Sequence, residues 1–204
     1  MGVRTLYGMS GSRAFRSVWA IEEVGIEYTH VATNFGADSK APDYLAVNPN
    51  GRIPALVDGD LVLFESMAIN LYLAERYGAG LYPDAAEDRA RTHQWSVWGI
   101  SEIEPLQMQI IVQTYFTPEE KRNPKVIENA KKGLERPLAV LDAHLADRDH
   151  LLGGDFTIAD LNLASVLDLL VTMTDHDLAG HAHVKRWTET CYARPSYAAA
   201  KARD

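Results

Sequence analysis

The pattern of hydrophobic and polar positions changes character near residue 80 of the chain. Before this point, short apolar runs alternate with stretches of helical spacing. Residues 3–7 and 28–32 are predicted strands, and the helix between them ends at Gly25. Because a strand–helix–strand unit joins parallel strands, the sheet is expected to begin with a parallel pair.

A β-hairpin is predicted after an irregular crossover. Residues 53–57 and 61–64 are apolar and flank Asp58-Gly59-Asp60, which is a strong turn signal. A helix over 67–77 follows. The order β-α-β and then β-β-α predicts a mixed sheet in a compact α/β domain over residues 1–80.

The remainder of the chain, residues 87–204, predicts an all-helical domain that follows a linker over 79–86. A long helical pattern runs to about residue 116, and Pro105 is expected to kink it. Asn123-Pro124 then combines an N-cap with proline at the first helical position. It opens a helix to about residue 147.

A capping box predicts the central helix of this second domain. Thr157 is followed three residues later by Asp160, the acidic partner of such a box, and an apolar helix over 157–174 results. Two shorter helices are predicted at 182–193 and 196–202.

The composition is typical of a globular protein that handles a small ligand. The chain is 47% hydrophobic and 24% charged, with a net charge of −8 and no long basic run, which argues against nucleic acid or anionic lipid as a partner. It lacks a signal-peptide core and a membrane-length apolar run. A single cysteine, Cys191, excludes an intrachain disulfide. We therefore expect a cytoplasmic protein.

Two motifs in the first domain suggest recognition of a peptide-like ligand. Proline at a strand start cannot donate to the ladder, so Ile53-Pro54 marks an edge or a special turn. A cis bond would free the Ile53 N–H and C=O for an extended peptide, whereas a trans proline is the commoner form. Ser66 at a helix start favours a carboxylate, and Glu65 favours an ammonium group. The alternative for this pair is a capped helix with a solvated glutamate.

These motifs, in this order behind a glycine-rich turn, resemble the glutathione transferase family. LYGMSGSRAFRSVWAIEEVGIEY is similar to its first strand and helix, NPNGRIPALVDGDLVLFES to its glutathione-binding core, and GGDFTIADLNLAS to the capping segment of its helical domain. The resemblance covers essentially the whole chain. It implies a thioredoxin-like domain over 1–80 and a helical-bundle domain over 87–204.

The resemblance implies glutathione as co-substrate and no metal. The residues implied to bind glutathione are Arg52, Ile53, Pro54, Glu65, Ser66 and Lys40. The Ile53 backbone would pair with the cysteinyl part, and Glu65 and Ser66 would hold the γ-glutamyl head. For the glycyl carboxylate Arg52 is favoured over Lys40, because Lys40 lies in a variable loop where a surface lysine is the simpler explanation.

In this family a group in the loop after the first strand activates the thiol. A free thiol has a pKa of about 8.5, and lowering it by two units requires about 2.7 kcal/mol, which is within reach of one charge-assisted hydrogen bond and a helix N-terminus. Ser12, at the predicted helix start, is the favoured donor, with Ser10 and then Tyr7 as alternatives. Arg13 stands where a related class keeps its cysteine, which argues against a cysteine-dependent thiol transferase.

The leading function is therefore attack of a glutathione thiolate on a small electrophilic, hydrophobic substrate in detoxification or catabolism. The family places the electrophile between the opening loop and the helix over 95–116, where an apolar stripe comprises Trp95, Trp98, Met108, Ile111 and Tyr115. Such a stripe is more often core or dimer interface. Glu102 and Glu104 lie on different helix faces, and the seven histidines form no metal constellation.

Other functions stay open at this point. One alternative is a non-catalytic binding or regulatory protein of the same fold. Another is a glutathione-dependent isomerase, peroxidase, dehalogenase or ether-cleaving enzyme, which would use the same thiolate. The family also implies a homodimer, with its interface on the helix after Ser66 and on the long helix after residue 86.

Overall fold

The computed structural model describes residues 4–203, and Val3, the predicted start of the first strand, lies outside them. The chain forms two compact units, Met1–Pro83 together with Ala193–Asp204, and Asp84–Tyr192. The boundary at residues 83–84 lies within the predicted linker. The second boundary differs from the prediction, because residues from Ala193 onward pack with the first unit and not with the helical one.

The first unit contains a four-stranded mixed sheet in the order β2-β1-β3-β4. β1 (Arg4–Tyr7) pairs in parallel with β2 (Thr29–Val31) and antiparallel with β3 (Ala55–Asp58). β3 pairs antiparallel with β4 (Leu61–Phe64) across the predicted hairpin turn. The mixed sheet and its parallel first pair are thus confirmed.

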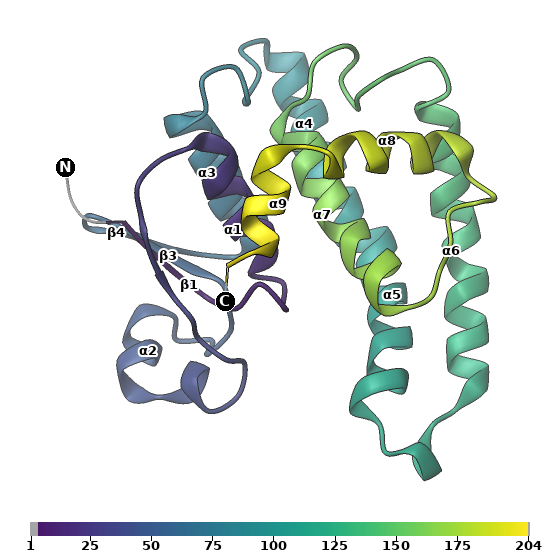
Figure 1. The fold of residues 1–204 in the computed structure, drawn as a ribbon, viewed down its shortest axis with the longest axis horizontal. Helices are drawn as coiled ribbons and strands as arrows, with labels where there is room; N and C mark the ends of the chain where they lie inside the picture. Colours follow the sequence, from purple (N-terminus) through teal and green to yellow (C-terminus); the bar gives the residue numbers. More distant parts are fainter. Residues whose placement is uncertain (1–3, 204) are drawn as a thin grey trace. The chain divides into compact units, whose positions relative to one another are not determined.

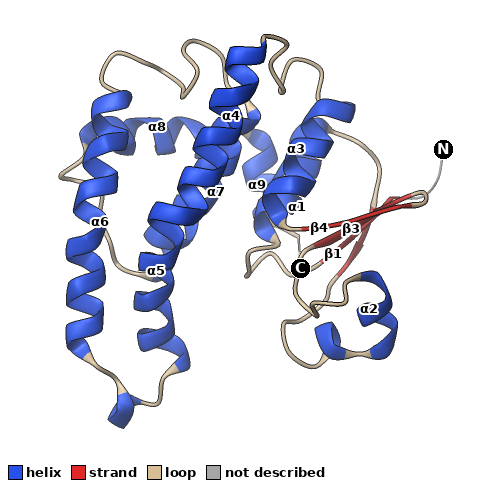
Figure 2. Cartoon of the chain, turned by 180° about the vertical axis from the view of Figure 1, so that it is seen from behind, coloured by secondary structure: helices blue, strands red, loops and turns tan. Residues whose placement is uncertain are grey.

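Helices cover both faces of this sheet. α1 (Phe15–Val24) and α3 (Ser66–Tyr77) pack together on one face, as Figures 1 and 2 show, and α2 (Pro42–Val47) lies on the other. α1 ends at Gly25, whose φ of 67° is the left-handed conformation that glycine adopts without strain. α2 replaces part of the irregular crossover. Its six residues are too few for a periodic signal, although proline at its start is typical of a helix.

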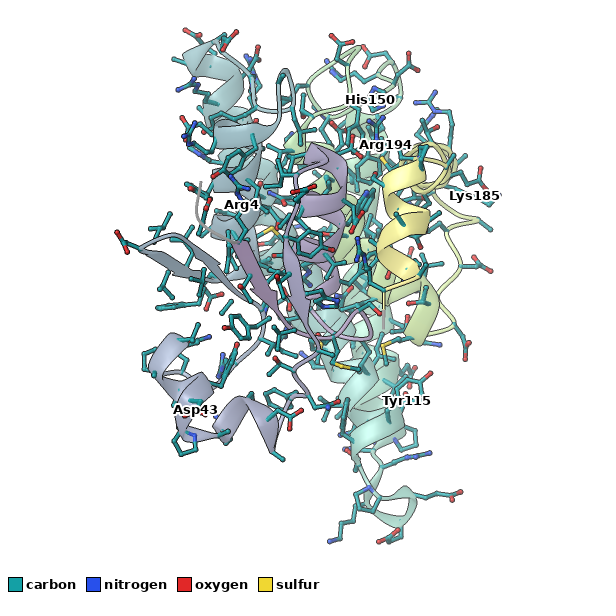
Figure 3. The ribbon with its side chains drawn as sticks, turned by 60° about the vertical axis from the view of Figure 1, so that its left-hand side comes forward. Arg4, Asp43, Tyr115, His150, Lys185 and Arg194 are labelled. Atoms are coloured by element: carbon teal, nitrogen blue, oxygen red, sulfur yellow. The ribbon has the colours of Figure 1, made fainter. Side chains whose placement is uncertain are left out.

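Polar contacts of Glu23 with Arg194 and Ser196, which we call the latch, explain why the C-terminal segment belongs to the first unit. α9 (Pro195–Lys201) packs on α1, and Arg194, labelled at its start in Figure 3, pairs with Glu23 at the end of α1. Arg194 Nε donates to the Glu23 carboxylate at 3.0 Å, and the Ser196 hydroxyl donates to the same group. Trp19 Nε1 donates to Ser196 Oγ at 3.0 Å. These contacts tie the end of the chain to the first helix.

The second unit is helical, and its first long helix contains one π-helical turn and ends in another. α4 (Ala86–Trp98) passes into a π-helical turn over Gly99–Ile103, followed by α5 (Glu104–Ile111) and a second π-helical turn over Val112–Phe116. Pro105 lacks an N–H and crowds the carbonyl of the preceding turn, and the wider π turn accommodates both effects. The predicted kink thus takes the form of a π turn.

The rest of this unit packs around a buried helix. α6 (Pro124–His144) packs on α5 and runs through Pro137, ending somewhat earlier than predicted, and α8 (Ala182–Tyr192) packs on α6 and α7 (Ile158–Met173). The predicted capping box is confirmed at the start of α7, where the Thr157 N–H donates to the Asp160 carboxylate at 2.9 Å. No helix of the described residues is long and apolar enough to cross a membrane.

Candidate functional site

Strand register brings three separate motifs to one end of the sheet. Tyr7 on β1 lies opposite Ala55 on β3, which in turn lies opposite Phe64 on β4. Since β3 runs antiparallel to both neighbours, the chain leaving β1, entering β3 and leaving β4 does so at the same end. The opening loop after Tyr7, Ile53-Pro54 and Glu65-Ser66 therefore meet there.

The opening loop is compact because of Gly8. Its φ of +143° is rarely adopted by residues with a side chain, and a Cβ at this position would lie 2.3 Å from the Ala14 Cβ and 3.6 Å from the Ile53 Cβ. The absence of a side chain lets the loop fold back on the start of α1 and lie against Ile53. Gly8 thus connects the serine loop to the strand that is expected to bind the ligand backbone.

Ser12 lies half-buried in this loop. Its Oγ donates to the Met9 carbonyl at 2.7 Å and accepts from the Ala14 N–H at 3.1 Å. α1 itself begins at Phe15 with Ala14 as N-cap and no side-chain cap, so Ser12 does not lie at the helix start as predicted. Ser12 closes the turn just before the helix instead, because the loop makes an extra turn between Ser12 and Phe15.

The other candidates in the opening loop occupy different settings. Ser10 is also half-buried, and Arg13 is exposed. Tyr7 lies within β1 and packs edge-to-face on the ring of Tyr44 at a centroid distance of 5.7 Å. Tyr7 therefore belongs to the sheet and not to the loop, as its place in the sequence indicated.

The Ile53–Pro54 peptide bond is cis. Ile53 is half-exposed, and neither its N–H nor its C=O takes part in a hydrogen bond within residues 4–203. Pro54 is buried directly before β3. A free N–H and C=O on one residue at a strand end can pair with the backbone of an extended peptide.

Glu65 and Ser66 lie at the start of α3. Glu65 has a φ of 72° and a ψ of 113°, a conformation that costs a residue with a side chain about 1–3 kcal/mol. Its carboxylate is exposed, Ser66 is only 8% exposed, and neither side chain has a hydrogen-bond partner among the described residues. The pair can thus offer a carboxylate to an ammonium group, and a hydroxyl and helix N-terminus to a carboxylate.

The two candidate cations lie on or against the turn that precedes Ile53. Arg52 is exposed and directly precedes Ile53. Lys40 Nζ donates to the Asn50 carbonyl at 3.2 Å, and a Cβ on Gly51 would lie 2.6 Å from that nitrogen. Lys40 therefore packs over the turn that leads into Arg52. Lys40 is itself exposed, as expected of a surface lysine, and its role at the glycyl carboxylate stays a prediction.

The predicted electrophile stripe lies in the second unit. Trp95 and Ile111 are buried, whereas Tyr115, labelled in Figure 3, is exposed on the second π turn. Of the two glutamates before Pro105, Glu104 is buried and Glu102 is exposed. Within residues 4–203 no group of three His, Cys, Asp or Glu side chains is placed to hold a metal ion.

Comparison with known proteins identifies the family. Residues 2–75 match the model of the glutathione S-transferase N-terminal domain, and residues 103–195 match that of the C-terminal domain. Glutathione S-transferase 3 of Zea mays is 36% identical over 94% of this chain and 90% of its own length. The chain belongs to the glutathione S-transferase family. The family and the fold class predicted from the sequence are thereby confirmed.

Solved structures of other glutathione S-transferases have a closely similar fold. The theta class glutathione S-transferase of Xanthomonas axonopodis pv. citri, solved with glutathione bound, is 33% identical with a TM-score of 0.90, over 100% of this chain and 99% of that one. Glutathione S-transferase I bound with lactoylglutathione is 32% identical with a TM-score of 0.88, over 98% of this chain and 99% of that one. Glutathione S-transferase GstB of Escherichia coli K12 is 31% identical over 94% of each chain.

The sequence did not reveal the residues that pack against Ile53 and hold the carbonyl of Arg52. Gly8 carried a turn signal but no sign of its contact with Ala14 and Ile53. Tyr44 within α2 and Asn48 directly after it are buried, and both donate to the Arg52 carbonyl. Nothing in the local sequence Asn-Pro-Asn-Gly indicated which carbonyl the Asn48 side chain would hold.

Proposed function

We propose that this protein is a glutathione transferase that binds glutathione at the end of the sheet in its first unit. The observation that carries the proposal is the register Tyr7–Ala55–Phe64, because it gathers the serine loop, Ile53 and Glu65-Ser66 at one place. Its family supports the same conclusion and does not favour a non-catalytic role.

Each charged end of glutathione has a matching group. The free N–H and C=O of Ile53 would pair with the cysteinyl backbone. The exposed Glu65 carboxylate would take the γ-glutamyl ammonium, while Ser66 and the first N–H groups of α3 would take the carboxylate beside it. Arg52 and Lys40 would meet the glycyl carboxylate at the other end.

Ser12 is the proposed activator of the thiol. To donate to a thiolate, its hydroxyl hydrogen turns away from the Met9 carbonyl, while the Ala14 N–H continues to hold Oγ. This exchanges a neutral hydrogen bond worth about 1 kcal/mol for a charge-assisted one worth about 1.5–3 kcal/mol. The bond from Ala14 polarises the hydroxyl and strengthens it as a donor. Ser10 is the second candidate.

The chemistry then needs no obligatory protein base. The thiol proton leaves to solvent, and the Ser12 hydrogen bond stabilises the resulting thiolate. The sulfur lone pair forms a C–S bond to the electrophilic carbon, and the displaced electron pair leaves with a leaving group or enters the conjugated system of the acceptor. We propose a small hydrophobic electrophile, handled in detoxification or catabolism in the cytoplasm.

Retention on immobilised glutathione together with conjugation of a generic aromatic electrophile tests the proposal. We expect both for the wild-type chain. A matched variant, Ser66→Ala, should elute earlier from glutathione resin. Retention without any turnover would favour the non-catalytic alternative, and failure of the wild-type chain to bind glutathione would refute the proposal altogether.

We also propose that the protein is a homodimer. Apolar side chains of β4 are exposed at the edge of the sheet, namely Leu61, Val62 and Phe64, and an exposed apolar edge strand is typically covered in solution. Sedimentation at working concentration tests this. A monomer would contradict it.

A further inference from the structure

A buried asparagine organises the turn that leads into Ile53. Asn48 is only 1% exposed, and its side-chain Nδ2 donates to the Arg52 carbonyl at 2.7 Å. Its Oδ1 accepts from the backbone N–H and the side-chain Nδ2 of Asn50, both at 3.1 Å. Its own carbonyl accepts from the Gly51 N–H at 2.9 Å. One side chain therefore spans the whole turn from residue 48 to residue 52.

A second buried donor meets the same carbonyl oxygen. Tyr44, which is 6% exposed, donates its hydroxyl to the Arg52 carbonyl at 2.5 Å. Burial raises the pKa of Tyr44 above its usual value, so the hydroxyl keeps its proton at neutral pH. Its ring is held edge-to-face by Tyr7. The Arg52 oxygen thus accepts hydrogen bonds from two buried donors.

The geometry of the Arg52–Ile53 peptide couples the hydrogen bonds at the Arg52 carbonyl to the direction of the Ile53 N–H. The Arg52–Ile53 peptide is trans and planar, so the Ile53 N–H points opposite to the Arg52 C=O. Donors that hold the oxygen toward the interior therefore hold the N–H toward the half-exposed side of Ile53, where no described residue pairs with it. Hydrogen bonds accepted by a carbonyl also polarise its peptide and strengthen the N–H as a donor.

We propose that Asn48 and Tyr44 are positioning residues that aim the Ile53 N–H at the cysteinyl backbone of glutathione. The inference rests on the proposed function and extends it to residues that do not touch the ligand. It assigns a binding role to a buried residue of α2 and to its C-cap, and α2 lies on the face of the sheet opposite α1 and α3 (Figure 2).

Tyr44→Phe is the most informative variant, because it removes one donor and keeps the ring that packs on Tyr7. We expect the dissociation constant of glutathione to rise about two- to tenfold, the effect of one hydrogen bond. S-methylglutathione should lose the same factor, because the contact concerns the backbone and not the sulfur. The pKa of the bound glutathione thiol should not change, because the Ser12 loop is untouched. Asn48→Ala, which removes the other donor and the turn contacts, should weaken binding further.

Tyr28→Phe is the matched control. It removes a tyrosine hydroxyl that donates to Glu22 at 2.6 Å in the same unit, away from the Arg52 carbonyl. We expect it to leave glutathione binding within twofold of wild type. A folded Tyr44→Phe protein that binds both ligands as tightly as wild type would overturn the inference alone. Failure of the wild-type chain to bind glutathione would overturn the proposed function and this inference together.

Discussion

The latch between Glu23 and Arg194 allows a prediction about which partner matters more for stability. The Glu23 side chain is 10% exposed and the Arg194 side chain 37%. We compare two neutral, similarly shaped replacements, Glu23→Gln and Arg194→Met. Removing either partner breaks the ion pair, but the two variants leave different charges behind.

The magnitudes follow from this difference in exposure. Arg194→Met leaves a largely buried carboxylate with the Ser196 hydroxyl, and breaking a buried pair in this way costs about 3–5 kcal/mol. Because Arg194 is partly solvated, we reduce this to about 2–4 kcal/mol. Glu23→Gln leaves a guanidinium that water can hydrate, so it should cost only about 1–2 kcal/mol.

The pH dependence has a definite sign. Burial acts to raise the pKa of Glu23, but hydrogen bonds from Arg194 and Ser196 outweigh it and hold the pKa below its ordinary value of 4.5. The stabilisation is therefore present above pH 4.5 and is lost as the pH falls below it. In Arg194→Met the effect of burial should prevail and raise the pKa of Glu23. As the pH falls towards 4.5, protonation of Glu23 should then remove the buried unpaired charge and reduce the variant's loss of stability.

Urea unfolding followed by tryptophan fluorescence and circular dichroism at pH 7 and pH 4.5 measures both effects. We expect Arg194→Met to lose more than Glu23→Gln at pH 7, and its deficit to shrink at pH 4.5. The reasoning is refuted if Glu23→Gln costs as much as Arg194→Met, or if the deficit of Arg194→Met is unchanged at acid pH.

Three further predictions concern the site and the stability of the chain. Gly8→Ala should cost about 2–4 kcal/mol in urea unfolding, from its positive φ and a contact of 2.3 Å with Ala14, whereas Gly11→Ala, with open space around its Cβ, should stay within about 1 kcal/mol; equal losses would contradict this. Ser66→Ala should raise the KM for glutathione about two- to tenfold in steady-state kinetics with kcat little changed, and an unchanged KM would count against its role. Burial lowers the pKa of His176 below 6.5, so stability should fall as the pH drops from 7 to 5, and His176→Asn should flatten that decline in urea titrations; parallel curves would disprove it.

Local patterns were sufficient for most elements of the fold. Asp58-Gly59-Asp60 located the hairpin, and the capping box at Thr157 located the start of α7. Such signals depend on neighbours within a few residues. The sequence did not predict α2, because six residues give no helical period. It did not predict the boundary at Ala193, because that boundary depends on the Arg194–Glu23 pair, which joins residues 171 positions apart.

The candidate site likewise contains some residues that short motifs predicted and some contacts that no motif could predict. Ile53, Pro54, Glu65 and Ser66 were recognisable from short motifs, and register then showed that these motifs share one end of the sheet. Their roles in binding glutathione stay predictions. What no motif could show is the packing behind them. The Lys40 amine against Asn50 and the donors on the Arg52 carbonyl depend on how two loops meet in space.

The pKa of the glutathione thiol bound to the protein tests the central claim most directly. Ultraviolet absorbance of the thiolate, titrated with pH, measures it for the wild-type chain, Ser12→Ala and Ser10→Ala. We predict a wild-type value about two units below the ordinary 8.5, a rise of about 1–2 units in Ser12→Ala, and little change in Ser10→Ala. A Ser12→Ala complex that titrates like wild type would contradict the assignment of Ser12 as the group that stabilises the thiolate.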